Sequence, residues 1–231
     1  MKEAIILAGG FGTRLRKVVS DLPKPMAPMD SDGTPFLQLL LEYLRKEGIK
    51  HIVLATGYKS EIISDFFGNR YRDIEISYSV EKDPLLTGGA IKQALRQCTQ
   101  ESVFVLNGDT YFDVSLSDLK EVHDANGADL TIALKPMHGF ERYGTVEIKG
   151  NRIISFHEKK YCDHGLINGG IYIINRSLLN NEENKFSFEI YLEKHVQDLK
   201  IIGYDTNQYF IDIGVPVDYA KAQNDFQKNI I

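Results

Sequence analysis

The sequence contains only two cysteines, Cys98 and Cys162, which lie far apart in its 231 residues. They match neither a disulfide framework nor the C-x-x-C spacing of a zinc or redox motif. A chain of this length can bury a stable core without such cross-links. We therefore expect both thiols to be ordinary buried side chains, in a single domain that covers residues 1–231.

Long hydrophobic runs and a basic excess are also lacking. No stretch approaches the length of a membrane span, and glycines at positions 9 and 10 leave no room for the apolar region of a signal peptide. The net charge of -5 argues against DNA or RNA, because binding a phosphate backbone normally needs a broad basic face. We therefore expect a cytoplasmic globular protein that binds neither a membrane nor a nucleic acid.

The first half of the chain, residues 1–126, alternates short apolar runs with amphipathic stretches. The apolar runs predict strands at 3–8, 51–56, 74–80 and 103–106. Apolar stripes at helical spacing predict helices at 34–48, 61–67 and 88–98. Strands that alternate with helices form sheets covered by helices on both faces. We expect an α/β fold with a Rossmann-like, three-layer αβα arrangement around a mixed, mostly parallel sheet.

The pattern changes after Gly127, where short strands follow one another with few helical residues between them. These strands are expected at 130–134, 145–148, 153–157, 170–174 and 201–204. Close succession of strands favours mixed or antiparallel pairing. A final helix is expected to begin at Pro216, because proline is favoured in the first turn of a helix.

A glycine-rich loop follows the first strand. Gly9, Gly10 and Gly12 lie where open α/β sheets bind their ligands, at the end of a strand. Because glycine has no Cβ, backbone N–H groups in such a loop can converge on an anion. The loop is not a P-loop, since no Gly-Lys-Ser/Thr follows, and Leu15 stands where the dinucleotide fingerprint has its third glycine. A purely structural turn is the alternative interpretation.

The same loop is basic within an acidic protein. Between positions 9 and 25 it carries one acid, Asp21, against Arg14, Arg16, Lys17 and Lys24. This local charge suits a small, highly charged ligand.

Two segments of this region resemble a known family. Gly9-Gly10-Phe11-Gly12-Thr13-Arg14-Leu15, followed by Pro23-Lys24-Pro25, resembles the signature of the sugar nucleotidyltransferases. These enzymes join a nucleoside triphosphate to a sugar 1-phosphate and release pyrophosphate, on a fold of the nucleotide-diphospho-sugar transferase type. The resemblance implies two catalytic residues: Arg14 would bind the triphosphate, and Lys24 would contact the phosphates at the reaction centre. The implied nucleotide-binding residues are Leu7, Ala8, Gly9, Gly10, Gly12, Thr13, Gly88 and Asp109.

Two carboxylates are candidates for a metal site. Asp109 ends an Asn-Gly-Asp segment after an apolar strand, and Asn-Gly between hydrophobic runs is also the strongest local signal for a hairpin. Asp212 lies in a strand, where an acid is costly without a partner, so a salt-bridged edge acid is its alternative. The family resemblance implies that this pair holds Mg²⁺, which typically takes one or two carboxylates plus substrate phosphate oxygens.

A third acidic segment suggests a different class of protein. Asp30-Ser31-Asp32 matches the D-x-D motif of metal-dependent glycosyltransferases. Its place just before Pro35 favours an exposed turn and helix cap over a metal site.

The second half carries the candidate residues for the sugar phosphate. Glu158 and Lys159 stand in a charged run that could simply be a solvated cluster. The family resemblance makes Lys159 a phosphate contact and Glu158 an acceptor from a sugar hydroxyl. Tyr143-Gly144 and Asn168-Gly169-Gly170 resemble sugar-binding segments of the family, with a strand bend at Gly144 and a turn at Asn168-Gly169 as the alternatives. We thus expect residues 1–126 to bind mainly the nucleotide and residues 127–231 mainly the sugar phosphate.

The stretch 78–90 resembles the base-recognition segment of the guanylyltransferase branch of this family, which implies GTP as the donor. One carboxylate can accept from both N1–H and the amine of guanine, and Glu81 is the candidate. As the alternative, Glu81 and Asp83 are ordinary loop acids. Leu86 departs from the family pattern, which usually has glycine there. Together with the short chain and segment 20–28, this stretch most resembles the branch that uses a heptose 1-phosphate; mannose 1-phosphate is the alternative acceptor. Whether the chain forms a homo-oligomer is left open.

Overall fold

The computed structural model describes residues 2–10, 15, 18–19 and 21–231. The strands are β1 (Glu3–Leu7), β2 (His51–Thr56), β3 (Arg70–Tyr71), β4 (Ile74–Val80), β5 (Ser102–Asn107), β6 (Thr110–Phe112), β7 (Leu130–Phe140), β8 (Thr145–Lys149), β9 (Arg152–His157), β10 (Cys162–Asn175), β11 (Ile201–Asp205) and β12 (Phe210–Asp212). The helices are α1 (Phe36–Lys46), α2 (Ser60–Phe67), α3 (Leu86–Leu95), α4 (Leu116–Asn126), α5 (Phe188–His195) and α6 (Pro216–Gln227), and a short 3-10 helix, η1, spans Lys24–Met26.

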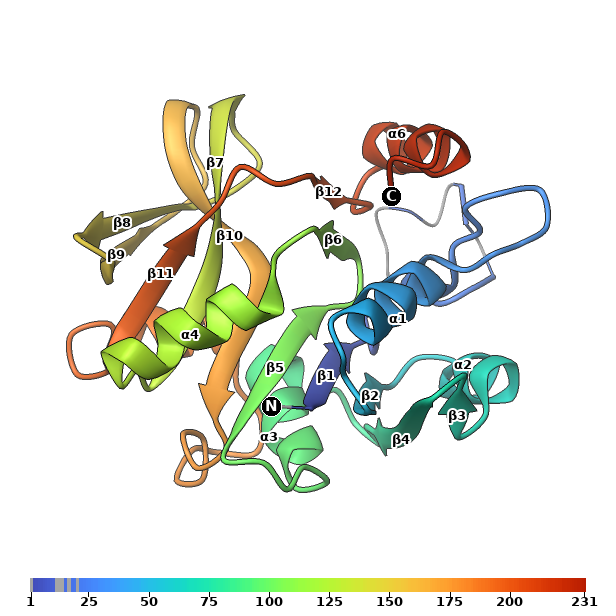
Figure 1. Cartoon of the computed structure of the whole chain (residues 1–231), viewed down its shortest axis with the longest axis horizontal. Coiled ribbons are helices and arrows are strands. Elements are labelled where there is room, and N and C mark those ends of the chain that lie inside the picture. Colours follow the sequence, from blue (N-terminus) through green and yellow to red (C-terminus); the bar gives the residue numbers. More distant parts are fainter. Residues whose placement is uncertain (1, 11–14, 16–17, 20) are drawn as a thin grey trace.

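The first half has the predicted layered arrangement. Strands β4, β2, β1 and β5 are adjacent and parallel. Along β1, Ala4 and Ile6 pack into one hydrophobic cluster with α1, whereas Ile5 packs into a second cluster with α3. This period of two is the pattern of a strand buried on both faces. Figure 1 shows α1 in front of the sheet and α3 behind it. The mixed α/β fold with helices on both faces is confirmed here.

The second half corrects the expectation of a mostly parallel sheet. The sheet continues through β10, β7, β11, β9 and β8, and β10 also pairs with β8. This extra pairing closes the five strands into a ring, which makes this half barrel-like. In the described part of the chain, antiparallel pairings outnumber parallel ones. Strands joined by tight turns, such as β8 and β9, cannot be parallel, because a parallel pair needs a long crossover connection.

The segment after β5 is not a hairpin. Strand β6 pairs with β12 in a separate two-stranded sheet, and β5 pairs with β1 and β10 instead. Gly108 passes so close to β1 that a Cβ there would lie 2.4 Å from the carbonyl oxygen of Leu7. The turn therefore carries the chain out of the main sheet. In the small sheet Asp212 lies opposite Thr110, the residue after Asp109.

Three smaller expectations were also tested. Cys98 is buried, which raises the pKa of its thiol to about 12. Cys162 is only half-buried, contrary to expectation, because it begins β10 at the exposed end of the β7–β10 pair. Among the described residues, no helix is both long and apolar enough to cross a membrane.

Candidate active site

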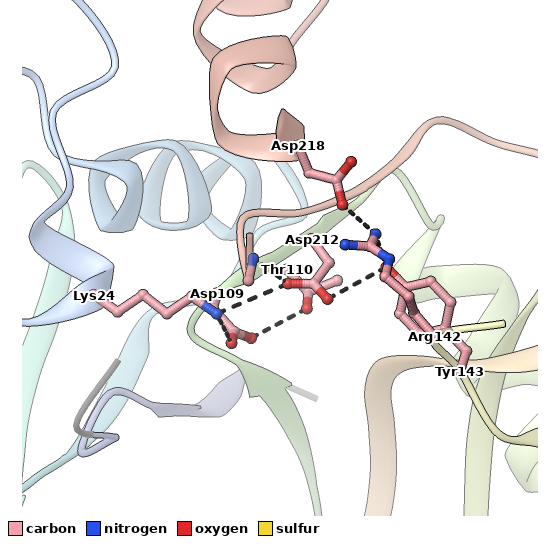
Figure 2. A network of polar contacts seen from close by, with 8 residues as sticks. Lys24, Asp109, Thr110, Arg142, Tyr143, Asp212 and Asp218 are labelled. Atoms are coloured by element: carbon pink, nitrogen blue, oxygen red, sulfur yellow. Dashed lines mark hydrogen bonds and ion pairs between the residues drawn. The ribbon is translucent and has the colours of Figure 1, made fainter. Parts of the chain in front are cut away.

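Lys24 lies between the two predicted metal ligands. Its ammonium donates a hydrogen bond to Oδ2 of Asp109 at 2.5 Å and lies 3.8 Å from Oδ1 of Asp212 (Figure 2). Only 13 % of the lysine side chain is exposed. The small β6–β12 sheet creates this cluster, because it brings the strand that ends at Asp212 beside the turn that contains Asp109. One predicted catalytic residue and both predicted metal ligands therefore meet at one point.

The electrostatics of this point favour a cation. Burial and then the charge of Asp109 raise the pKa of Asp212. The ammonium of Lys24, the amide of Gly214 at 2.6 Å and the hydroxyl of Tyr143 at 3.3 Å act in the opposite direction. Two partly buried carboxylates that share one ammonium are a donor set that suits Mg²⁺. Among the described residues there is no cluster of three or more His, Cys, Asp or Glu side chains that could hold a metal ion by themselves.

A cavity of about 550 Å³ opens beside Lys24 and Asp109. Among the predicted nucleotide-binding residues, it is lined by Leu7, Gly9, Gly10, Glu81 and Asp109. Ala8 does not line it; its side chain is buried and its amide donates to the carbonyl of Ala55. The cavity thus collects residues from the ends of β1, β2, β4 and β5, at the edge where an open α/β sheet binds ligands.

Glu81 is held against the glycine-rich segment. A Cβ at Gly9 would lie 3.1 Å from Oε1 of Glu81, so a side chain at this position would press on the carboxylate. The amide of Leu85 donates to Oε2 at 2.8 Å and fixes the orientation of the group. Burial raises the pKa of Glu81, and the hydrogen bond from Leu85 lowers it in part. Asp83 is exposed, so Glu81 is the acid in this segment that faces the cavity.

The neighbouring helix α3 begins in an unusual conformation. Leu86 has a φ of 63°, in the left-handed region that glycine adopts most easily, and its side chain is 52 % exposed at the cavity. The loop therefore keeps a glycine-like conformation although the glycine is replaced. Gly88 is buried and does not line the cavity, since a Cβ there would lie 2.2 Å from the ring of Phe186. Its predicted contact with the nucleotide stays a prediction.

A second cavity, of about 470 Å³, holds every predicted sugar-phosphate residue. It is lined by Gly144, Glu158, Lys159 and Asn168, and by Glu189, Leu192 and Glu193 from α5. Glu189 lines both cavities, which places them side by side. Asn168 lies where the β10–β7 register shifts, a bulge of the kind often found next to active sites. Its amide nitrogen donates to the hydroxyl of Tyr172 at 2.9 Å, which orients the side chain.

Some candidates lie elsewhere. Gly12, Thr13 and Arg14 fall outside the described residues. The D-x-D segment forms a turn, in which both oxygens of Asp30 accept hydrogen bonds from Thr34 at 2.9 and 2.7 Å. Both carboxylate oxygens therefore accept hydrogen bonds within the same loop, as the turn interpretation predicted.

Two residues of the site were not among the predicted ones. Glu189 sits in helix α5, and Arg142 lies in the loop before β8. Tyr143 contacts Asp212, and Arg142 pairs with Asp218 of α6 (Figure 2). Tyr143 and Gly144 were predicted together as a sugar-binding segment, but spacing alone does not connect this loop with residue 212.

Comparisons with known proteins agree on one family. Residues 3–229 match the Nucleotidyl transferase family. The chain is 54 % identical over 231 residues to D-glycero-alpha-D-manno-heptose 1-phosphate guanylyltransferase of Aneurinibacillus thermoaerophilus, covering 99 % of this chain and 100 % of the relative. It is 48 % identical over 220 residues to the protein of the same name from Campylobacter jejuni, covering 94 % and 96 %. The crystal structure of HddC from Yersinia pseudotuberculosis, also solved in complex with GMP-PN, superimposes with a TM-score of 0.86 at 36 % identity, covering 98 % and 100 % of the two chains.

Proposed function

The chain belongs to the nucleotidyl transferase family, and we propose that it transfers a guanylyl group from GTP to D-glycero-α-D-manno-heptose 1-phosphate, giving GDP-heptose and pyrophosphate. The family predicted from the glycine-rich loop and the Pro-Lys-Pro segment is thus confirmed. Two relatives named for this reaction match nearly the whole chain at 54 % and 48 % identity, which supports GTP and a heptose 1-phosphate as the substrates.

One observation carries the proposal: a cavity lined by Lys24 and Asp109 adjoins a second cavity, with Glu189 in the lining of both. Asp212 lies 3.8 Å from the ammonium of Lys24. The first cavity is lined by five of the nucleotide-binding candidates, and the second is lined by all four sugar-phosphate candidates. The reaction must bring two anionic phosphates together, so its site needs positive charge between two binding cavities. Lys24 lines the first cavity and Lys159 lines the second.

The chemistry requires alignment more than proton transfer. A phosphate monoester has a second pKa near 6, so the acceptor is largely a dianion at neutral pH and needs no general base. An oxygen of this dianion forms a bond to the α-phosphorus of GTP, while the bond from that phosphorus to the β-phosphate oxygen breaks and pyrophosphate leaves. We assign Lys24 to the α-phosphate and Lys159 to the acceptor phosphate. Asp109 and Asp212 would hold Mg²⁺, which neutralises phosphate charge when bound.

Lys24 would change partners during this cycle. In the free protein its ammonium pairs with Asp109. With Asp109 and Asp212 engaged by a divalent cation, Lys24 would lose this partner and could contact the α-phosphate. Arg14 remains the candidate for the β- and γ-phosphates.

The remaining residues account for selectivity. Glu81 would accept from N1–H and the exocyclic amine of guanine, whereas uracil or thymine would present a carbonyl oxygen to the carboxylate. Glu158 and Asn168 are assigned to hydroxyl groups of the sugar. We further propose that the enzyme acts in the cytoplasm, where GTP is available, and supplies GDP-heptose for a capsule or lipopolysaccharide.

Pyrophosphate release, measured with five nucleoside triphosphates against heptose, mannose and glucose 1-phosphates in the presence of Mg²⁺, tests this function. The highest specificity constant is expected for GTP with the heptose 1-phosphate. A preference for UTP or dTTP would overturn the guanylyl assignment. Release of GDP from GDP-heptose in the presence of a sugar acceptor, without pyrophosphate formation from GTP, would instead indicate a glycosyltransferase.

A further inference from the structure

The loop between β7 and β8, residues 141–144, touches three parts of the site with three consecutive residues. Arg142 forms an ion pair with Asp218 in the first turn of α6. Tyr143 donates a hydrogen bond to Asp212, and Gly144 lines the sugar-phosphate cavity. Figure 2 shows the side chains of Arg142 and Tyr143 converging on Asp218 and Asp212.

Tyr143 fixes one side of the Asp212 carboxylate. The phenol donates to Oδ2 at 3.3 Å, while the amide of Gly214 donates to Oδ1 at 2.6 Å. Each oxygen thus has its own donor, which restrains rotation of the group. The phenol ring lies edge-on against Phe210 of β12, with the ring centroids 6.1 Å apart.

Arg142 determines the direction of that hydrogen bond. Its guanidinium donates to the hydroxyl of Tyr143 at 3.2 Å and lies over the phenol ring, 5.5 Å from the centroid. A guanidinium can only donate, so the phenol oxygen accepts from it and directs its own proton toward Asp212. Arg142 also pairs with Asp218. The loop therefore contacts both ends of the turn that joins β12 to α6, at Asp212 and at Asp218.

Gly144 connects these contacts of Arg142 and Tyr143 with the sugar-phosphate cavity. A Cβ at this position would lie 2.5 Å from the carbonyl oxygen of His157, so the backbone packs tightly against the end of β9. The next residues, Glu158 and Lys159, line the same cavity. A ligand bound in this cavity therefore packs against Gly144, which directly follows Tyr143 in the chain.

We propose that Arg142 and Tyr143 are positioning residues that couple occupation of the sugar-phosphate cavity to the orientation of Asp212. The inference rests on the proposed function, in which Asp212 is a cation ligand. A sugar phosphate that packs against Gly144 restrains the loop and holds Asp212 in the orientation that binds the cation. By reciprocity, the cation tightens binding of the sugar phosphate.

The coupling is measured as Mn²⁺ binding without turnover. Mn²⁺ affinity is determined by calorimetry with guanosine 5′-(α,β-methylene)triphosphate, which cannot react at the α-phosphate, in the absence and presence of heptose 1-phosphate. In the wild-type protein the sugar phosphate is expected to tighten Mn²⁺ binding roughly fivefold or more. In Tyr143→Phe this enhancement should vanish, while the affinity for sugar phosphate without metal stays within about twofold of wild type.

Two further variants separate positioning from structure. Tyr161→Phe removes a hydroxyl from a tyrosine that is 65 % exposed and lines neither cavity, and it should keep the full enhancement. Arg142→Lys keeps a charge for Asp218 but loses the planar fork that reaches both partners, so an intermediate enhancement is expected.

Equal enhancement in wild type and Tyr143→Phe would overturn the coupling. Failure of the proposed function shows itself separately, as absence of pyrophosphate release from GTP by the wild-type protein.

Discussion

Lys24 donates a hydrogen bond of 2.5 Å to Asp109, although 85 residues separate the two in the sequence. The same ammonium lies 3.8 Å from Asp212, the other carboxylate that we propose as a cation ligand. The lysine offsets the repulsion between the two acids in the free protein. The same side chain would offset phosphate charge in the reacting complex.

Removing this charge should abolish most of the activity. Lys24→Met is expected to fold but to lower kcat roughly 10³-fold, by analogy with other groups that neutralise a transferring phosphate. Lys50→Met is the control, because Lys50 forms an exposed ion pair with Asp73 just before β2 begins, whereas the cavity is lined near the other end of this strand, at Ala55. Steady-state pyrophosphate release gives both values. A folded Lys24→Met protein with near-normal turnover would contradict the role of Lys24.

Asp212→Asn should gain stability and lose activity. The pKa of Asp212 is raised above its unfolded value by burial and by Asp109. Ionisation of Asp212 therefore lowers the free energy of unfolding. The protonated carboxyl makes its full favourable contribution below the unfolded pKa of 3.8, and this contribution is lost as the pH rises through the folded pKa. In metal-free buffer at pH 7 the amide should raise the free energy of unfolding, with no gain below pH 3.8. Mg²⁺-dependent activity should be abolished in this variant and in Asp109→Asn.

Urea unfolding of the wild type and of Asp212→Asn, at pH 7 and at a pH below 3.8, measures this change in the free energy of unfolding. Asp73→Asn is a control of opposite sign, because the hydrogen bond from Lys50 lowers the pKa of Asp73 and its ionisation favours folding. An Asp212→Asn protein that is less stable than wild type at pH 7 would show that the carboxylate stabilises the free protein.

The parts that could be predicted from the sequence are those with a local signal. Buried apolar runs located the strands of the first half, and the family motifs selected Lys24, Asp109 and Asp212. The ring of β7 to β11 could not be predicted, because the β10–β8 pairing depends on contacts between distant segments. The same limit hid the β6–β12 sheet, which decides that Asp109 faces Lys24 and does not end a hairpin.

Some missed features did have a signal. Helices α4 and α5 begin after Ser115 and Ser187, whose side chains accept from the amides of Asp118 and Ile190. Serine at the N-cap is a recognisable start of a helix. By contrast, no pattern connects Arg142 with Asp218, because this ion pair joins a loop and a helix from separate parts of the second half.

Glu81→Gln should reduce selectivity for guanine. The amide offers one acceptor and one donor where guanine needs two acceptors. Loss of a charged hydrogen-bond partner costs about 1.5 to 3 kcal/mol, or roughly ten- to a hundredfold in the ratio of kcat/KM for GTP over UTP. The exposed acid Asp83 supplies the control, Asp83→Asn, which should leave the ratio unchanged. If Asp83→Asn changed the ratio and Glu81→Gln did not, base recognition would belong to Asp83.

Leu86→Gly should stabilise the protein. A residue with a Cβ in the left-handed conformation costs roughly 1–2 kcal/mol, and glycine removes that cost at the φ of 63°. The greater freedom of glycine in the unfolded chain offsets part of the gain, which leaves a net increase of about 0.5–1 kcal/mol in the free energy of unfolding. Leu86→Ala also removes most of the side chain but keeps a Cβ in the left-handed conformation. It therefore serves as the reference when the free energy of unfolding is measured by denaturant titration. A Gly variant that is less stable than the Ala variant by about 0.5–1 kcal/mol, the entropic cost of glycine alone, would show that the backbone at this position is unstrained.

The proposed use of the two adjoining cavities is tested most directly by a crystal structure of the protein with GDP-D-glycero-α-D-manno-heptose and Mg²⁺. The guanine is expected beside Glu81 in the first cavity, and the heptose among Gly144, Glu158 and Asn168 in the second. The diphosphate should lie between Lys24 and Lys159, with the cation on Asp109 and Asp212. A heptose bound outside the second cavity, or a diphosphate without contact to Lys24, would contradict this arrangement.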